Sequence, residues 1–368
     1  MTEAHFILSK KVVNEQVDKL VDLGLKVSYS YKTNREVGNV LQEICPEVDF
    51  SIHAKEEIEM IKNKSKIWFF TQAESEEELK EILNKGIRNF VIDNEIDLER
   101  ILRVLDDVNE IVREDSEKKV SEKYFLKNPL KINLSLRMRF REHRIGTGRY
   151  FVYGMPCQRV NKLILKLRKN KFIYKLGVHI HRKSQNASEW EIKSELEDSL
   201  EKNVLDRIDF LNFGGGLPVG YISYTSRILN YIFKKIKDAS DWLNEKGIEV
   251  FIEPGRFIAA PSVKLITEII QIYDNKIVLN TTIYNCALDT VIGQHKMLVD
   301  GELGEEEDGE FFLLKGNSPT RDDIFRYKVK LKNPQVGDEI VFLNAGAYNY
   351  TTDFFGYKKL KTNIVEGF

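Results

Sequence analysis

Cysteine is scarce in this 368-residue chain, which contains only Cys45, Cys157 and Cys286. Three widely separated cysteines provide neither a disulfide framework nor the closely spaced thiolate pairs of a structural zinc site. The sequence therefore favours a protein of a reducing compartment, and we expect a cytoplasmic location.

Excess charge of one sign and long apolar runs are also missing. The formal net charge is -1, so the chain lacks the strongly basic character of a nucleic-acid-binding protein. No apolar run approaches the roughly 18 residues that span a membrane, and residues 1–16 do not show the pattern of a signal peptide. We expect no nucleic-acid partner and no membrane partner.

Short β-rich runs alternate with amphipathic helical stretches through most of the chain. Glu-rich first turns and Lys-rich last turns of these stretches suit the helix dipole. Eight β/α units predict an α/β fold, a (β/α)8 TIM barrel. A doubly wound open sheet is the alternative, but no G-x-G-x-x-G follows the first strand. The expected strands are residues 27–31, 48–52, 66–71, 88–93, 132–138, 175–181, 208–214 and 248–254.

The pattern changes after about residue 256, where short strands separated by turns predict an all-β domain. Residues 1–14 are expected to join that domain, because they begin with another β-rich run. We therefore expect a barrel over residues 15–255 and a β-domain over residues 256–368. The charged stretch 113–129 breaks the alternation and is expected to form a surface excursion between the fourth and fifth strands.

Chemistry in such barrels lies at the C-terminal ends of the strands. Lys32 closes the first strand, where desolvation would lower its pKa and make it able to form a Schiff base. A lysine that extends its amine into solvent from a strand end is the alternative. His179 and His181 share one face of the sixth strand. Metal ligation, stacking on a flat cofactor and core packing all remain open for them, and no third ligand stands at a suitable spacing.

The last two expected strands end in a glycine triplet, residues 214–216, and in Glu253. Consecutive glycines expose backbone N–H groups and permit positive φ, which suits phosphate binding. A carboxylate in the barrel mouth requires a cation, and a protonated pyridine nitrogen would be one. An amine, an aromatic platform, a phosphate site and a carboxylate are together what pyridoxal-phosphate catalysis requires.

These residues resemble the motifs of the fold-type III pyridoxal-phosphate decarboxylases, which include ornithine, arginine, diaminopimelate and carboxynorspermidine decarboxylases. The segment 29–34, YSYKTN, is similar to the motif Y-A-V-K-x-N that carries the cofactor lysine. The segment 177–181, GVHIH, followed by Ser184, is similar to G-x-H-x-H-x-G-S-Q. The resemblance implies an alanine-racemase-like barrel with a β-domain, in which His181 stacks on the cofactor ring and Ser184 meets the phosphate.

Three further segments complete the resemblance. Residues 213–216 resemble the I-G-G-G phosphate loop, residues 253–256 are identical to E-P-G-R, and residues 346–348 are identical to G-A-Y. The implied catalytic residues are Lys32, His181 and Glu253. The implied cofactor-binding residues, with no metal, are Lys32, Arg137, His181, Ser184, Gly214, Gly215, Gly216, Glu253, Gly255, Arg256 and Tyr348.

The chain departs from the family in a segment that relatives contribute across a dimer interface, G-P-x-C-[DE]. Residues 316–323 stand there, with Pro319 in place of the cysteine and Thr320 in place of the acid. The resemblance implies a homodimer with shared active sites, to which both this segment and Tyr348 contribute. The Cα proton donor stays open between Lys32, Thr320 and water. The implied substrate-binding residues are Thr320, Arg321, Asp322 and Asp323.

The resemblance implies a decarboxylase that removes the α-carboxylate of an amino acid, a diamino acid or a related polyamine- or siderophore-type precursor. An amino-acid racemase on the same architecture is one alternative, although racemases normally lack the G-A-Y segment. A non-catalytic pyridoxal-phosphate-binding regulatory protein is another, because the donor segment is altered. Arg321 would select a distal carboxylate, whereas Asp322 or Asp323 would select a distal amine. A solvated surface turn is the alternative for all three.

Overall fold

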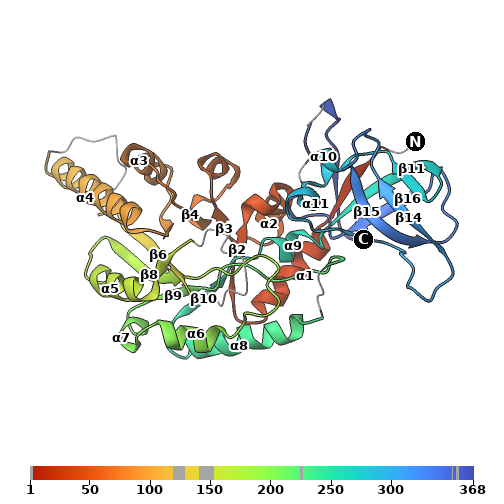
Figure 1. Cartoon of the computed structure of the whole chain (residues 1–368). Helices are drawn as coiled ribbons and strands as arrows, with labels where there is room; N and C mark the ends of the chain where they lie inside the picture. Colours follow the sequence, from red (N-terminus) through yellow and green to blue (C-terminus); the bar gives the residue numbers. More distant parts are fainter. Residues whose placement is uncertain (1–2, 119–128, 141–152, 224–226, 350, 354–355) are drawn as a thin grey trace.

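The computed structural model describes residues 3–118, 129–140, 153–223, 227–349, 351–353 and 356–368. Eight parallel strands form a closed barrel in the order β5-β4-β3-β2-β10-β9-β8-β6, and pairing of β5 with β6 completes the ring (Figure 1). The TIM barrel and all eight of its predicted strands are confirmed. The strands are β2 (Lys26–Ser30), β3 (Asp49–Ile52), β4 (Ile67–Phe70), β5 (Asn89–Ile92), β6 (Ile132–Arg139), β8 (Ile173–His179), β9 (Phe210–Asn212) and β10 (Glu249–Ile252).

Amphipathic helices cover the outside of the barrel. In α2 the N-cap residue Asn34 accepts backbone hydrogen bonds, and Val37, Val40 and Leu41 are buried at helical spacing. The helices are α1 (Lys10–Val21), α2 (Arg35–Ile44), α3 (Glu76–Asn84), α4 (Glu95–Lys118), α5 (Cys157–Leu167), α6 (Ile192–Ser199), α7 (Lys202–Leu205), α8 (Leu229–Asn244) and α9 (Arg256–Ala259). Helix α4 is longer than the sequence suggests: residues 113–118 continue it, and residues 119–128 lie outside the described part.

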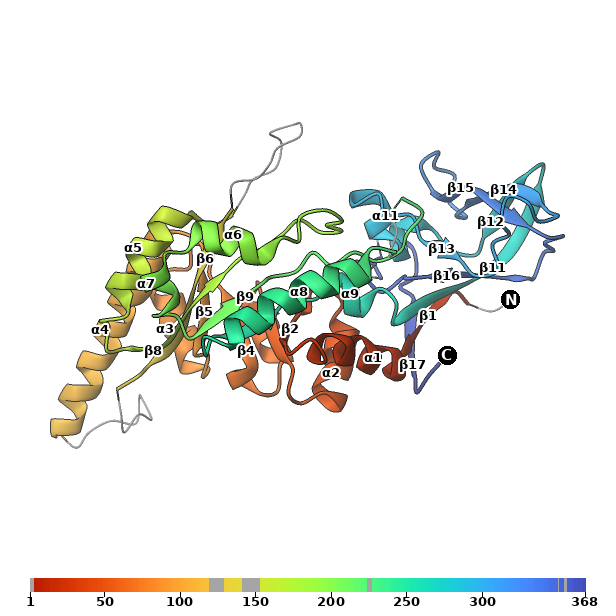
Figure 2. The same ribbon diagram turned by 90° about the horizontal axis from the view of Figure 1, so that it is seen from below.

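The second domain is an eight-stranded sheet beside the barrel (Figure 2). Strand β1 (His5–Ser9) pairs with β11 and β17, so the N-terminal run belongs to this sheet. Helix α1 follows directly at Lys10, five residues before the expected boundary. The remaining elements are β11 (Val263–Tyr273), β12 (Lys276–Leu279), α10 (Ile283–Cys286), α11 (Leu288–Ile292), β13 (Leu298–Val299), β14 (Glu310–Lys315), β15 (Ile324–Leu331), β16 (Glu339–Leu343) and β17 (Lys361–Val365). In the barrel domain a two-residue strand, β7 (Met155–Pro156), pairs in parallel with the end of β6.

Aromatic side chains pack inside the barrel toward the N-terminal ends of its strands. The rings of Trp68, Phe210 and Phe251 lie with centroids 5.0–5.8 Å apart. At the same end Glu249 forms ion pairs with Lys26 and Lys175. In this fold the chemistry is expected at the opposite, C-terminal mouth of the barrel.

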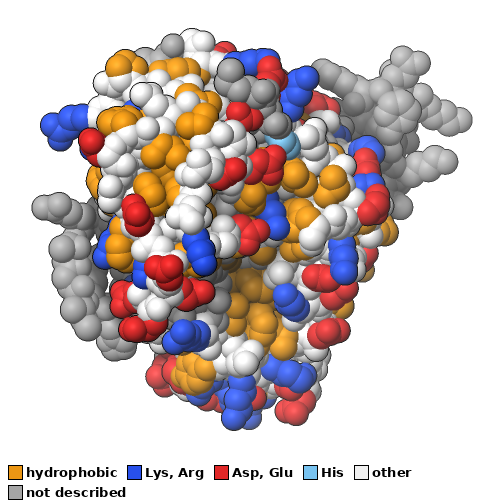
Figure 3. All heavy atoms as spheres, turned by 90° about the vertical axis from the view of Figure 1, so that its right-hand side faces the viewer, with side chains coloured by type: hydrophobic (Ala, Val, Ile, Leu, Met, Phe, Trp, Pro, Cys, Tyr) orange, Lys and Arg blue, Asp and Glu red, His pale blue; other side chains and the backbone are white. Residues whose placement is uncertain are grey.

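The face of the molecule seen in Figure 3 carries charges of both signs. On the face seen in Figure 3, Lys and Arg side chains are interspersed with Asp and Glu side chains and with hydrophobic patches. Among the described residues no helix is both long enough and apolar enough to cross a membrane.

Candidate active site

Lys32 lies just beyond β2, in a short 3-10 turn formed by residues 31–33. Tyr31 and Thr33 on either side are buried, whereas Lys32 is accessible to solvent. The protein nevertheless surrounds its amine closely: burial lowers the pKa of Lys32, the charge of Arg137 lowers it further, and Glu253 opposes the shift. An accessible amine with a lowered pKa is a competent nucleophile.

Glu253 follows β10 and is buried in the barrel mouth. Its Oε1 accepts hydrogen bonds from Ser51 Oγ at 2.8 Å and Asn212 Nδ2 at 3.0 Å. Its Oε2 lies 2.8 Å from His179 Nε2. Burial alone would raise the pKa of this carboxyl, but His179 and Ser51 outweigh burial and lower the pKa to about 2. Glu253 is therefore a permanent anion at neutral pH.

His181 is a neutral imidazole at the edge of the glycine loop. Its Nδ1 accepts a hydrogen bond from the Gly215 amide at 3.2 Å, which assigns the ring proton to Nε2. Burial, with Arg137 as the next cause, lowers the pKa of His181 to about 3. Its ring lies nearly parallel to that of His179, at 12° and 6.2 Å. Although protein atoms surround the His181 ring, part of it remains accessible to solvent. That exposed part is suited to stacking on a flat cofactor.

Three potential metal ligands meet here. The spacing of residues in the sequence indicated only two of them, the histidines, as possible ligands of one metal. Ligand atoms of His179, His181 and Glu253 all lie within 4.8 Å of one another. Glu253 comes from β10, far along the chain from the histidine pair, so local spacing missed it. Its oxygens already accept three hydrogen bonds, and His181 Nδ1 accepts one from Gly215. We therefore assign these groups to an organic cofactor.

His53 is a residue of the mouth that the sequence did not single out. It stands just beyond β3, two residues after Ser51, and its ring stacks on Phe70 at 4.5 Å and 18°. Burial, and then the charge of Lys32, lowers the pKa of His53 to about 3. The alternation of Asp49, Ser51 and His53 was the available signal.

The glycine triplet differs in detail from the expected nest of free amides. The Gly214 amide donates to Asn212 Oδ1 at 2.8 Å, and the Gly215 amide donates to His181. Gly214 and Gly216 have φ of 67° and 109°. A Cβ on Gly214 would lie 2.2 Å from the Ile180 carbonyl oxygen. The triplet is thus needed for close approach and positive φ, and two of its three amides fix side chains.

Ser184, Arg256 and Tyr348 meet at the same end of the mouth. The Arg256 Nε donates to Ser184 Oγ at 3.4 Å, and its guanidinium lies 5.2 Å from the Tyr348 ring centroid. Tyr348 has φ of 58°, and its amide donates to the Thr33 carbonyl at 3.0 Å. Gly255 packs so tightly that a Cβ there would lie 2.2 Å from Thr33 Oγ1.

The contacts of Tyr348 correct one expectation. Tyr348 touches Thr33 and Arg256 of its own chain, so it serves the barrel that carries the neighbouring Lys32. The expectation that Tyr348 contributes across a dimer interface is therefore wrong.

Arg137 projects from β6 and belongs to the same electrostatic group. Burial lowers its pKa, while Glu253 and Asp93 oppose that shift. Its guanidinium lies 5.1 Å from the Tyr153 ring centroid.

The loop between β14 and β15 carries the four residues expected to bind substrate. Asp323 is fully buried, and its oxygens accept the backbone amides of Ile283 at 2.9 Å and Ser318 at 3.0 Å. Asp323 therefore shapes the loop and is not available to a substrate, contrary to the sequence-based expectation. Thr320 donates to Tyr284 Oη at 3.2 Å.

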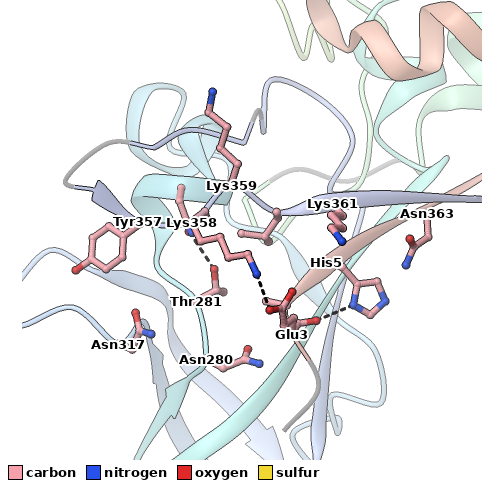
Figure 4. A pocket seen from close by; sticks show the side chains of 13 residues that line it. Glu3, His5, Asn280, Thr281, Asn317, Tyr357, Lys358, Lys359, Lys361 and Asn363 are labelled. Carbon is pink, nitrogen blue, oxygen red and sulfur yellow. Dashed lines mark hydrogen bonds and ion pairs between the residues drawn. The ribbon is translucent and has the colours of Figure 1, made fainter.

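Arg321 and Asp322 are different, because their side chains are 92% and 76% exposed and pair with each other at 3.3 Å. Among the described residues no hydrogen bond or ion pair joins the loop to Lys32, His181 or Glu253 of the same chain. A hollow of about 490 Å³ borders this loop at Asn317. Figure 4 shows Lys358 reaching toward Glu3 across it. None of the mouth residues lines that hollow, so we do not place the chemistry there.

Comparison with known proteins places the barrel in a described family. A family model described as "pyridoxal-dependent decarboxylase, pyridoxal binding domain" matches residues 10–260. A diaminopimelate decarboxylase of Staphylococcus aureus is 25% identical over 366 residues, which cover 90% of this chain and 79% of that protein. A carboxynorspermidine/carboxyspermidine decarboxylase of Campylobacter jejuni is 23% identical over 208 residues, covering 51% of this chain and 53% of that protein.

Solved structures share the architecture at low sequence identity. Diaminopimelate decarboxylase from Helicobacter pylori, complexed with L-lysine, superposes with a TM-score of 0.79 at 17% identity, covering 100% of this chain and 92% of the other. Lysine decarboxylase from Selenomonas ruminantium superposes with a TM-score of 0.76 at 18% identity, covering 100% and 93%. These structural similarities show that the chain shares the fold of those proteins, a barrel with a β-domain.

Proposed function

We propose a substrate class for this chain, which belongs to the pyridoxal-dependent decarboxylase family: it removes the α-carboxylate of a diamino acid or a related amine-ended amino acid. The family's cofactor is pyridoxal 5′-phosphate, and the mouth residues fit that group. The proposal depends mainly on one observation: the buried Glu253 anion lies close enough to the accessible Lys32 amine for its charge to affect the pKa of Lys32. His179 Nδ1 is buried and has no hydrogen-bond partner among the described residues.

When bound, the cofactor supplies an electron sink for the electron pair left as CO2 departs. Lys32 would hold the cofactor through its amine. Glu253 would keep a proton on the ring nitrogen, because its pKa of about 2 leaves it ionised throughout the physiological range. His181 would offer a neutral flat face, and Ser184 with Tyr348 would offer hydroxyl groups to the phosphate.

The substrate class rests on the relatives together with the β14–β15 loop. The named relatives are decarboxylases of diaminopimelate and of carboxylated polyamines. In this chain Asp322 and Arg321 are the exposed charges of the loop, whereas the Asp323 carboxylate already accepts hydrogen bonds from two backbone amides. We therefore propose that Asp322 binds the ammonium group at the distal end of the substrate, with Thr320 beside it.

The same loop supports a homodimer with shared active sites. Its exposed charges make no contact with the described mouth of their own chain, whereas Tyr348 completes its own chain's site. We propose that the loop of one protomer reaches the mouth of its partner. A cytoplasmic location is part of the proposal, supported by three free cysteines.

Product analysis by mass spectrometry tests this function. The loaded enzyme would be incubated separately with ornithine, lysine, arginine, diaminopimelate, carboxynorspermidine, glutamate and alanine. We expect loss of CO2 from at least one amine-ended substrate and no reaction with glutamate or alanine. Exchange of enantiomers without CO2 loss would instead establish a racemase, and an unchanged panel would leave only cofactor binding.

A further inference from the structure

A buried ion pair joins the two domains beside the proposed phosphate end. Arg256 opens α9 at the end of the barrel, whereas Asp289 lies in α11 of the β-domain. Arg256 Nη1 lies 2.5 Å from Asp289 Oδ2, and Nη2 lies 3.0 Å from Oδ1. The two side chains are only 6% and 5% exposed. This is a bidentate pair, which fixes orientation as well as charge.

Asp289 is itself held from several sides. Its amide donates to Asn349 Oδ1 at 3.0 Å, and His295 Nδ1 lies 3.4 Å from its Oδ1. Burial alone would raise the pKa of Asp289, but the nearby His295 ring and the hydrogen bonds from Arg256 outweigh burial and lower it. The carboxylate therefore remains ionised, and its position is set by the β-domain.

The guanidinium of Arg256 has little capacity left for another anion. Two of its five N–H groups go to Asp289, one goes to Tyr221 Oη at 3.0 Å, and Nε faces Ser184 Oγ at 3.4 Å. Its charge is compensated by Asp289 at contact distance. While this arrangement lasts, Arg256 keeps one Nη2 hydrogen for another anion, so it cannot bind a phosphate through both Nη groups. It can instead fix Ser184 and the Tyr348 ring that lies against it.

We propose that Asp289 is a positioning residue for cofactor binding: by holding Arg256 across the domain boundary, it orders Ser184 and Tyr348 as the phosphate-binding end. Cofactor binding then requires a docked β-domain. The proposal rests on the family's cofactor and is independent of which amino acid is decarboxylated.

Titration of the cofactor-free protein with pyridoxal phosphate and with pyridoxal, which lacks the phosphate, tests this role. The variants are Asp289→Asn and Asp289→Ala. A matched control is Glu302→Gln, because Glu302 is also a bidentate partner of a buried arginine, Arg326, within the β-domain. Bound cofactor is followed by its absorbance, and melting temperature reports folding.

We expect both Asp289 variants to raise the Kd for pyridoxal phosphate at least tenfold and the Kd for pyridoxal less than twofold. The control should change neither value more than twofold. Tyr221→Phe, which removes one hydrogen bond from the same guanidinium without changing shape, should raise the Kd for pyridoxal phosphate about threefold. It covers the case in which the Asp289 variants do not fold. An unchanged ratio of the two Kd values in the folded variants would overturn the proposal, and so would tighter binding of pyridoxal phosphate.

Discussion

Glu253 shows how strongly the surroundings of one residue set its chemistry. A buried carboxylate is costly unless it is hydrogen-bonded, and this one accepts bonds from Ser51, Asn212 and His179. These partners come from three different strands, so the anion is rigidly placed before any cofactor enters. A preorganised anion stabilises developing charge without rearrangement during the reaction.

The substitution Glu253→Gln removes that charge while keeping the shape of the side chain. We expect cofactor binding to persist and kcat to fall by about 10²–10³, the usual cost of losing one preorganised electrostatic contact. Glu249→Gln is the matched control, because Glu249 lies at the opposite end of β10. Turnover near that of the wild type in Glu253→Gln would disprove the role of this carboxylate.

The lowered pKa of Lys32 has a consequence for cofactor capture. Only the neutral amine attacks an aldehyde, so the rate of capture should rise with pH and level off above the pKa of Lys32. Because burial lowers that pKa, the midpoint should lie below the ordinary value of 10.5. Stopped-flow absorbance of the cofactor-free protein mixed with pyridoxal phosphate measures the midpoint. A midpoint at or above 10.5 would contradict this assignment.

Sequence reasoning at the residue scale singled out residues where a motif is contiguous and missed contacts between residues that are far apart in the chain. Lys32, Glu253 and Tyr348 stand in recognisable segments. Asp289 does not, because its partner Arg256 comes from the other domain. Asp323 was assigned to substrate because its segment stands where the family has its substrate-binding residues, whereas folding turns it toward backbone amides.

Among the elements, the barrel strands were predictable because each is a short β-rich run between helical periods. Less predictable were elements whose local pattern is ambiguous. The stretch 55–60 contains helix-forming residues yet forms a 3-10 helix, and residues 113–118 extend α4. The glycine loop after β9 was located by sequence, but the pairing of its amides with Asn212 and His181 depends on how β8 and β9 align.

That loop permits a controlled test of close packing. Gly214→Ala would place a Cβ 2.2 Å from the Ile180 carbonyl oxygen at a φ of 67°. Gly247→Ala has a similar φ of 75° but meets no heavy atom within 4 Å. Both should lose about 1 kcal/mol of stability from backbone strain. Only Gly214→Ala should also weaken pyridoxal phosphate binding, at least tenfold by absorbance titration. Equal affinities in the two variants would show that the loop does not contact the cofactor.

At the scale of the whole molecule, the β-domain contributes Tyr348 and Asp289 to contacts with its own barrel, whereas Arg321 and Asp322 of the β14–β15 loop are exposed. Among the described residues, no hydrogen bond or ion pair joins Arg321 or Asp322 to the mouth of that barrel. From the family resemblance, both Tyr348 and the loop were expected to contribute to the active site of the partner subunit. The fold separates the two, because the Tyr348 amide bonds to Thr33 of the same chain.

Mixing inactive variants tests this division of labour. Lys32→Ala mixed with an Arg321→Ala/Asp322→Ala double variant should regain about a quarter of wild-type activity through random subunit pairing, because one site per mixed dimer is intact. Lys32→Ala mixed with Tyr348→Ala should regain none, since both residues serve the same chain's site. Rescue by Tyr348→Ala, or no rescue by the loop variant, would refute the proposed arrangement.

Lys32 is expected to be the covalent anchor of pyridoxal phosphate in this barrel. Borohydride reduction of the loaded enzyme, followed by proteolysis and mass spectrometry, tests this role. We expect one pyridoxyl group per chain, on the peptide that contains Lys32, and no label in Lys32→Ala. A pyridoxyl group on any other lysine, or undiminished labelling of Lys32→Ala, would contradict it.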